Sequence, residues 1–290
     1  MKKVDRTVIE RRIVFLILVL AVMLPMLFPL GLKTQSTPLT QKVYDLIESV
    51  PTGAPVILSF DYDPSVITEI QPMALALIEH AWKKGHKVIA TAMWPQGPQM
   101  ADRAFNEVKE KLAEQNPEAE LPEYGKDYVN LGYKPGGLVT IQGMGRNMKA
   151  IFPSDITGKK YEEIPLLEKV RTLKDIRYVI SLSAGDPGLR DWIMTAKGKF
   201  NVPVAGGTTA VSTPGFLPYV SDQDQLHGLL GGLKSAAEYE LLMGYEGDAS
   251  RGMNPQSVAH ILILLLILFG NIRAARKRKA DKLALEENNG

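Results

Sequence analysis

Two short runs decide the fold predicted for this chain: Val56-Ile-Leu-Ser-Phe60 and Lys87-Val-Ile-Ala-Thr-Ala-Met93. Both are apolar and rich in β-branched residues, which is typical of strands that are buried on both faces. Between them, residues 66–84 have the amphipathic pattern of a helix, which Gly85 ends after two lysines. A strand, a helix and a second strand in this order predict a parallel sheet.

The same alternation continues along the chain. We expect further strands at 127–131, 176–182 and 202–205, and further helices at 99–115, 138–152, 189–200 and 223–243. The predicted fold is therefore α/β, a doubly wound and mostly parallel sheet of about five strands, Rossmann-like in class. A transmembrane helix is expected on either side of it, one N-terminal and one C-terminal.

An apparent internal repeat supports the doubly wound arrangement. Asp63-Pro64 follows the first strand, and Asp186-Pro187 follows the strand at 176–182 at the same distance. Asp is a good N-cap and Pro suits the first position of a helix, so each pair is expected to open a helix. A ligand-binding role for the two aspartates is the alternative interpretation.

Two uncharged apolar runs predict the membrane spans, at 13–32 and 255–272. The first has 20 residues, enough for about 30 Å of helix, and no small-residue cleavage site follows Pro25. We therefore interpret it as a retained signal anchor, with a cleaved signal peptide as the alternative. The second has 18 residues and is followed by Arg273 and Arg276-Lys-Arg-Lys279, a stop-transfer pattern. Its alternative is a buried core helix.

Basic residues lie at the terminal end of each span, in the tails 1–12 and 273–290. The positive-inside rule then places both tails in the cytoplasm. Residues 33–254 are expected on the other side of the inner cell membrane, as one periplasmic or extracellular domain. The tails hold eleven basic and five acidic residues of the chain's 34 Lys and Arg and 32 Asp and Glu, which leaves this domain at −4. An acidic domain does not favour nucleic acid as a partner.

Several kinds of active site are excluded by composition and motif. The chain has no cysteine, so disulfides and thiolate chemistry are excluded. It contains neither Gly-x-Ser-x-Gly nor His-Glu-x-x-His, and its four histidines are scattered. His80 and His86 are expected on or just after a solvated helix face. No cofactor, metal site or catalytic set of residues is predicted.

A ligand, if one binds, is expected in the crevice at the carboxyl ends of the strands, where open α/β sheets hold ligands. The glycine-rich loop after the third strand can accept an anion, with Lys134 adding charge. The candidate ligand-binding residues are Asp61, Asp63, Lys134, Gly136, Gly137, Asp186, Thr208 and Thr209.

Small residues recur in the helix predicted at 223–243, where each glycine costs about 1 kcal/mol relative to alanine. Close approach of another backbone is the natural compensation, either inside the domain or in a neighbouring protein. The candidate protein-contact residues are Gly228, Gly231, Gly232 and Ala236. From these features we expect an interaction subunit of a larger membrane assembly, with the lipid bilayer and other subunits or further copies of the chain as partners. The alternative is a domain that binds, or acts on, a small anionic molecule.

Overall fold

A computed structural model describes residues 6–28, 35–221 and 225–288 of the chain. The chain divides into two compact units: residues 34–250 form an α/β domain, and residues 1–33 with 251–290 form the second unit. Residues 29–32 of the first predicted span and residues 223–224 of the helix predicted at 223–243 lie outside the described residues.

Six parallel strands form the sheet of the domain, in the order β3-β2-β1-β4-β5-β6. The prediction of a doubly wound α/β fold is confirmed at this level, because the chain winds one way from β1 to β3 and the other way from β4 to β6. The strands are β1 (Pro55–Asp61), β2 (Lys87–Ala92), β3 (Tyr128–Tyr133), β4 (Val179–Ser183), β5 (Val204–Thr208) and β6 (Leu229–Gly231).

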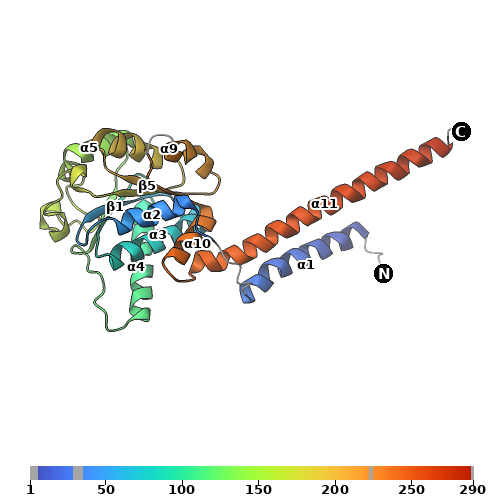
Figure 1. Ribbon diagram of the computed structural model, residues 1–290, viewed down its shortest axis with the longest axis horizontal. Helices are drawn as coiled ribbons and strands as arrows, with labels where there is room; N and C mark the ends of the chain where they lie inside the picture. Colours follow the sequence, from blue (N-terminus) through green and yellow to red (C-terminus); the bar gives the residue numbers. More distant parts are fainter. Residues whose placement is uncertain (1–5, 29–34, 222–224, 289–290) are drawn as a thin grey trace. The chain divides into compact units, whose positions relative to one another are not determined.

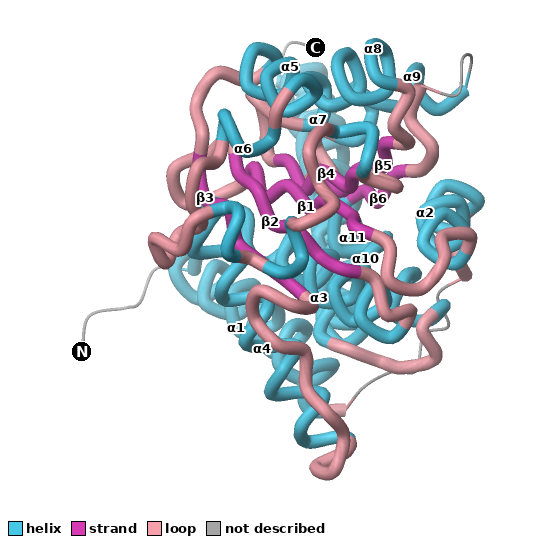
Figure 2. Tube along the Cα trace, turned by 90° about the vertical axis from the view of Figure 1, so that its left-hand side faces the viewer, coloured by secondary structure: helices cyan, strands magenta, loops and turns pink. Residues whose placement is uncertain are grey.

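Helices cover both faces of the sheet, as Figures 1 and 2 show. One face carries α2 (Pro38–Glu48), α3 (Ile67–Lys83), α4 (Gly97–Gln115) and α10 (Gly232–Leu242). The other carries α5 (Leu138–Arg146), α6 (Met148–Ile151), α7 (Leu189–Trp192), α8 (Gly198–Phe200) and α9 (Leu217–Ser221). A π-helical stretch, Ile193–Lys197, joins α7 to α8. Short 3-10 turns lie at Pro64–Val66, Tyr161–Glu163, Pro165–Leu167, Leu173–Asp175 and Thr213–Phe216.

Burial on both faces explains why the sequence of β1 is almost continuously apolar. It is a central strand with helices on both sides, and its residues from Val56 to Asp61 are all buried. Alternate residues point to opposite helix layers. Ile57, Ser59 and Asp61 therefore share a face, and Ile57 packs in the core beneath α5 and α7.

The helix predicted at 223–243 is wrong in its first half. Residues 229–231 form the sixth strand, and the helix α10 begins only at Gly232, whose φ of +62° lies in the left-handed region. A strand of three residues has too few positions to show a period of two, so the run of small residues on either side favours a helix throughout. The predicted strand number, about five, is corrected to six.

Two further helix predictions need correction. The helix predicted at 138–152 is broken at Asn147, whose extended backbone ends α5 and whose side chain caps α6. The second Asp-Pro pair does not open a helix: the Asp186-Pro187 peptide is cis, and α7 starts at Leu189 after Gly188. Asp63 does cap a helical turn, because its carboxylate accepts the amide of Ser65 at 2.8 Å.

The second unit consists of α1 (Arg6–Leu27) and the greater part of α11 (Asp248–Asn288). One helical segment among the described residues, Asp248–Arg276 within α11, has the length and apolar composition needed to cross a membrane. The described part of α1 contains only residues 13–27 of the predicted first span. A C-terminal candidate span is therefore found, and the two-span arrangement stays a prediction.

Candidate functional site

The carboxyl ends of β1 and β4 lie side by side at the switch point of the sheet. Asp61 pairs with Ser183 across β1 and β4, and Ser183 pairs with Thr208 across β4 and β5. These three polar residues form one row, and all three are buried. Because a doubly wound sheet opens its crevice at this point, the row is the candidate functional site.

Asp61 is the central group of this row and is fully buried. Its Oδ1 accepts the backbone amide of Met93 at 2.8 Å, and its Oδ2 accepts the hydroxyls of Ser59 at 2.8 Å and Ser181 at 3.1 Å. Burial raises the pKa of Asp61 to about 7, although these donors and the Trp192 indole favour the ionised form. Asp61 therefore changes charge near neutral pH inside the protein.

Three buried polar atoms near this layer have no hydrogen-bond partner among the described residues. They are Thr91 Oγ1, Trp192 Nε1 and Thr195 Oγ1. Thr91 lies on β2 opposite Ser59 of β1, so its hydroxyl belongs to the polar end of the sheet. The indole N–H of Trp192 helps to lower the pKa of Asp61 as a weak donor, although the two groups do not form a hydrogen bond of ordinary geometry. Unpaired buried polar atoms are uncommon, and π-helical turns such as the one that holds Thr195 are frequent at functional sites.

The loops above the row are packed against one another. The indole of Trp94, after β2, donates to the carbonyl of Pro187, after β4, at 2.8 Å. Gly137, after β3, comes so close to Pro187 that a Cβ on Gly137 would lie 3.2 Å from the Pro187 Cβ. A Cβ on Gly188 would collide with the Ser183 hydroxyl. The chain's own loops therefore cover the polar row.

The candidate residues predicted from the sequence do not all meet at this row. Asp61 and Thr208 belong to it, and Thr209 is buried next to it. Lys134 is half-buried, and its backbone amide donates to Ala92 at 2.9 Å. Asp186 is exposed.

Two further candidates have local roles in the loops. The carboxylate of Asp63 is engaged with Ser65, whose hydroxyl and amide lower its pKa. Gly136 adopts a φ of +117°, and a Cβ there would meet the Thr140 hydroxyl at 2.8 Å. The sequence analysis chose the carboxyl end of the sheet as the candidate site but did not single out Ser59, Ser181, Thr91 and Trp192. Serine and threonine are common in apolar strands, so their presence there does not indicate that their hydroxyls donate to the same carboxylate.

The small residues predicted for protein contacts have neighbours inside the domain. A Cβ on Gly228 would lie 2.8 Å from the backbone nitrogen of Val43 in α2, and one on Gly231 would meet Thr213. Gly232 faces Ala210 and Glu69, and Ala236 is fully buried in α10. Packing within the domain accounts for the small size of these residues.

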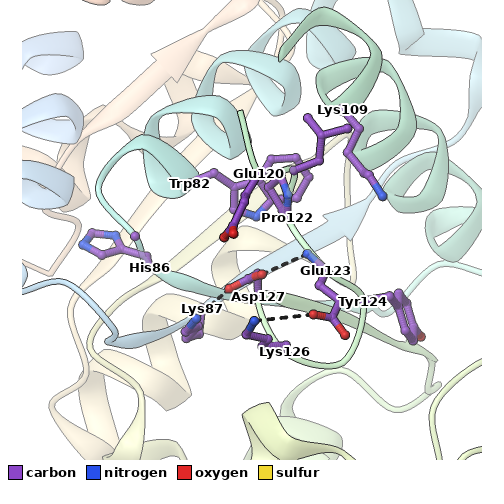
Figure 3. Close-up of a pocket in the computed structure, with 12 residues that line it drawn as sticks. Trp82, His86, Lys87, Lys109, Glu120, Pro122, Glu123, Tyr124, Lys126 and Asp127 are labelled. Carbon is purple, nitrogen blue, oxygen red and sulfur yellow. Dashed lines mark hydrogen bonds and ion pairs between the residues drawn. The ribbon is translucent and has the colours of Figure 1, made fainter. Parts of the chain in front are cut away.

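A pocket of about 800 Å³ lies at the opposite, amino-terminal end of β2 and β3, far from the predicted crevice. Figure 3 shows two ion pairs in it, Lys87 with Asp127 at 2.6 Å and Lys126 with Glu123 at 3.5 Å, while Lys109 lies over the ring of Tyr128. The Asp127 carboxylate also accepts the backbone amide of Glu123 at 2.9 Å. Open α/β sheets bind their ligands at the carboxyl ends of the strands. This pocket lies at the amino-terminal ends, so it does not replace the predicted site.

Comparison of the chain with protein-family models, with curated proteins and with solved structures finds no match. Among the described residues, no group of three or more acidic or histidine side chains is placed to hold a metal ion. The arrangement at the sheet edge can hold or release one proton at Asp61. The hydroxyls of Ser59 and Ser181 that donate to this carboxyl group are themselves buried, and no second carboxyl or imidazole group among the described residues forms a hydrogen bond with it.

Proposed function

We propose that the chain is a membrane-anchored, non-catalytic component of a larger membrane assembly. Its α/β domain makes the protein contacts on the extracytoplasmic side, and spans at 13–32 and 255–272 hold it to the membrane with both tails in the cytoplasm. This proposal extends the one candidate span in α11 to a two-span topology.

The closure of the carboxyl edge is the observation that supports a non-catalytic role. Both oxygens of Asp61 are occupied by donors of the same chain, and the loops that would admit a substrate contact one another through Trp94, Pro187 and Gly137. An enzyme needs functional groups that reach its substrate. The buried row lacks such exposed groups, whereas a protein contact requires only the outer surface of the domain.

Native mass spectrometry of the full chain, extracted gently from its own membrane, tests the proposal. We expect species of fixed stoichiometry heavier than the 32.0 kDa monomer. A monomer alone, in mild detergent and at several protein concentrations, contradicts the proposed assembly.

The topology has a separate test, because the chain has no cysteine of its own. In intact cells, Ala150→Cys is expected to react with a membrane-impermeant maleimide, and Arg276→Cys only after the cells are opened. Both positions are exposed. The reverse labelling pattern contradicts the proposed orientation.

A second candidate function is the binding or conversion of a small anionic molecule at the carboxyl edge. The specific observation in its favour is the Asp61 carboxyl group, which changes charge near neutral pH and accepts the hydroxyl of Ser59, the residue opposite the unpaired Thr91. Perturbed carboxyl groups of this kind occur often at functional sites. A thermal-shift screen with small anions distinguishes the candidates: stabilisation that is lost in Lys134→Ala or Asp186→Ala, in protein that still folds, favours ligand binding.

A further inference from the structure

A second pocket lies on the outside of the domain, where the α5–α6 junction meets the segment after the turn at 165–167. We call it the Arg146–Arg171 pocket. Its volume is about 610 Å³, within the range of small-molecule sites. The residues that line it are Arg146, Asn147, Lys149, Tyr161, Glu162, Leu167, Glu168, Val170, Arg171 and Thr172.

The inner part of this pocket is apolar. Tyr161, Leu167 and Val170 are buried members of the hydrophobic core and also line the pocket. The only polar group on the Tyr161 ring is satisfied, because its hydroxyl donates to the carbonyl of Val170 at 2.8 Å. These three residues are almost wholly buried, so the base of the pocket is formed by the small exposed edges of apolar side chains and has no unmet hydrogen bond.

The rim of the pocket carries two arginines on separate segments. Arg146 is the last residue of α5, and Arg171 lies beside the Asn147–Met148 turn, where its carbonyl accepts the Met148 amide at 2.8 Å. Both side chains are exposed. The structure gives neither guanidinium an ion pair with a described residue, although Arg171 lies near enough to Asp175 to help lower the pKa of that carboxyl group.

The other charges of the rim are largely neutralised. Lys149 and Glu162 form an ion pair with each other. This leaves two guanidinium groups and one carboxylate, that of Glu168, and so a net positive rim above an apolar base. Arginine forms paired hydrogen bonds with carboxylate and phosphate oxygens, which makes it well suited to this kind of ligand.

We propose that the Arg146–Arg171 pocket binds a small organic anion, a carboxylate or phosphate ester with an apolar body. The apolar body packs on Tyr161, Leu167 and Val170, and the anionic group lies between the two guanidinium groups. The amino-end pocket in Figure 3 is larger but contains no arginine: two of its lysines, Lys87 and Lys126, are paired with acids, and the third, Lys109, lies over the ring of Tyr128. The proposal is independent of the assembly role proposed above.

Calorimetric titration of the full chain in phosphatidylcholine nanodiscs tests this site, with 1-naphthyl phosphate as the probe. We expect saturable binding at a one-to-one ratio, at least tenfold tighter than the binding of neutral naphthalene methanol or of inorganic phosphate. The double variant Arg146→Gln with Arg171→Gln is expected to bind the probe at least tenfold more weakly. The matched control Arg190→Gln, an exposed arginine on α7 outside the pocket, is expected to bind like the original chain.

Three results would overturn the proposal. They are no saturable binding by the original chain at millimolar probe, equal binding of the neutral analogue, and unchanged binding by a double variant that melts like the original. Nanodiscs with added phosphatidylglycerol separate two sources of the anion. Displacement of the probe there identifies a lipid headgroup, and unchanged binding identifies a soluble molecule.

Discussion

The Nδ1 atom of His80 lies 2.6 Å from the hydroxyl oxygen of Tyr239, and both side chains are buried. The other ring nitrogen of His80 lies 2.8 Å from a carboxylate oxygen of Glu48. Because a carboxylate only accepts, the Nε2–H donates to Glu48 and Nδ1 accepts from Tyr239 in the neutral imidazole. One histidine thereby ties α3 to both α2 and α10.

The first prediction concerns the pH dependence of this contact. Burial lowers the pKa of His80, and the hydrogen bond to Glu48 only partly offsets this. The unfolded chain then binds a proton at a higher pH than the folded chain, so His80 lowers stability as pH falls below about 6.5. In thermal unfolding at pH 7.5, we expect His80→Gln to be less stable by about 2–4 kcal/mol. The difference should narrow at pH 5.

Tyr239→Phe is the matched control for this prediction. It removes the donor to Nδ1 but keeps the titrating imidazole, so its stability should still fall with decreasing pH. If the difference between His80→Gln and the original chain is the same at pH 5 and pH 7.5, the neutral, buried state of His80 is refuted.

A second prediction follows from Asp61 and has the opposite sign. Its pKa is raised from 3.8 to about 7, so the folded chain binds this proton more tightly than the unfolded chain. The contribution of Asp61 to the free energy of unfolding is fully present below about pH 4 and is lost as pH rises through about 7. Asn imitates the neutral carboxyl group, and Asp61→Asn should raise the melting temperature at pH 8 and leave it nearly unchanged at pH 4. The size of the pKa shift limits the gain in the free energy of unfolding at pH 8 to at most on the order of 4 kcal/mol.

Asp63→Asn is the control for the Asp61 prediction. The hydroxyl and amide of Ser65 lower the pKa of Asp63, so its substitution should cost stability at pH 8 instead of adding it. An Asp61→Asn variant that is less stable than the original chain at pH 8 would show that the buried carboxyl group is better accommodated as an ion.

The sequence predicted the sheet well because its strands are long enough to show their pattern. The runs at 56–60 and 87–93 correspond to β1 and β2, and the strands at 127–131, 176–182 and 202–205 overlap β3, β4 and β5. The strand β6 was not predicted, because residues 229–231 are too few to show the alternation of buried and exposed residues that indicates a strand.

The prediction that His80 and His86 lie on a solvated face was wrong, since both are buried. An amphipathic helix predicts one buried face, but α3 is also covered by α10 and is contacted at His80 by Tyr44 and Glu48 of α2, which are distant in sequence. The same limit applies to the candidate site. Asp61 stood out as a charged residue at a strand end, but its partners Ser59 and Ser181 are joined to it only by the register of β1 and β4.

A third prediction tests the close approach of α7 to the sheet. A Cβ on Gly206 in β5 would collide with the side chain of Leu189 in α7. We expect Gly206→Ala to lower the free energy of unfolding by about 1–3 kcal/mol through overpacking. Leu189→Ala alone should cost about 2–5 kcal/mol because it leaves a cavity. In the double variant the new methyl group enters that cavity, so denaturant unfolding should give less than the sum of the single losses. If the losses in the free energy of unfolding add up in the double variant, Gly206 and Leu189 are not in contact.

The last prediction concerns the second unit, in which α1 and α11 are joined by an ion pair. Arg273 lies 3.1 Å from one carboxylate oxygen of Glu10 and 3.3 Å from the other. The contact places residue 10 beside residue 273, and we expect the two helices to pack antiparallel in this register. Since the chain contains no other cysteine, Glu10→Cys with Arg273→Cys should be joined efficiently by a short bismaleimide in native membranes. Glu10→Cys with Gln256→Cys is the control. Residue 256 precedes residue 273 in α11 and lies about 25 Å from it along the helix axis, at 1.5 Å per residue. Equal cross-linking of both pairs, or of neither, would exclude this register, since a fixed antiparallel pair brings only one of the two positions within reach of the reagent.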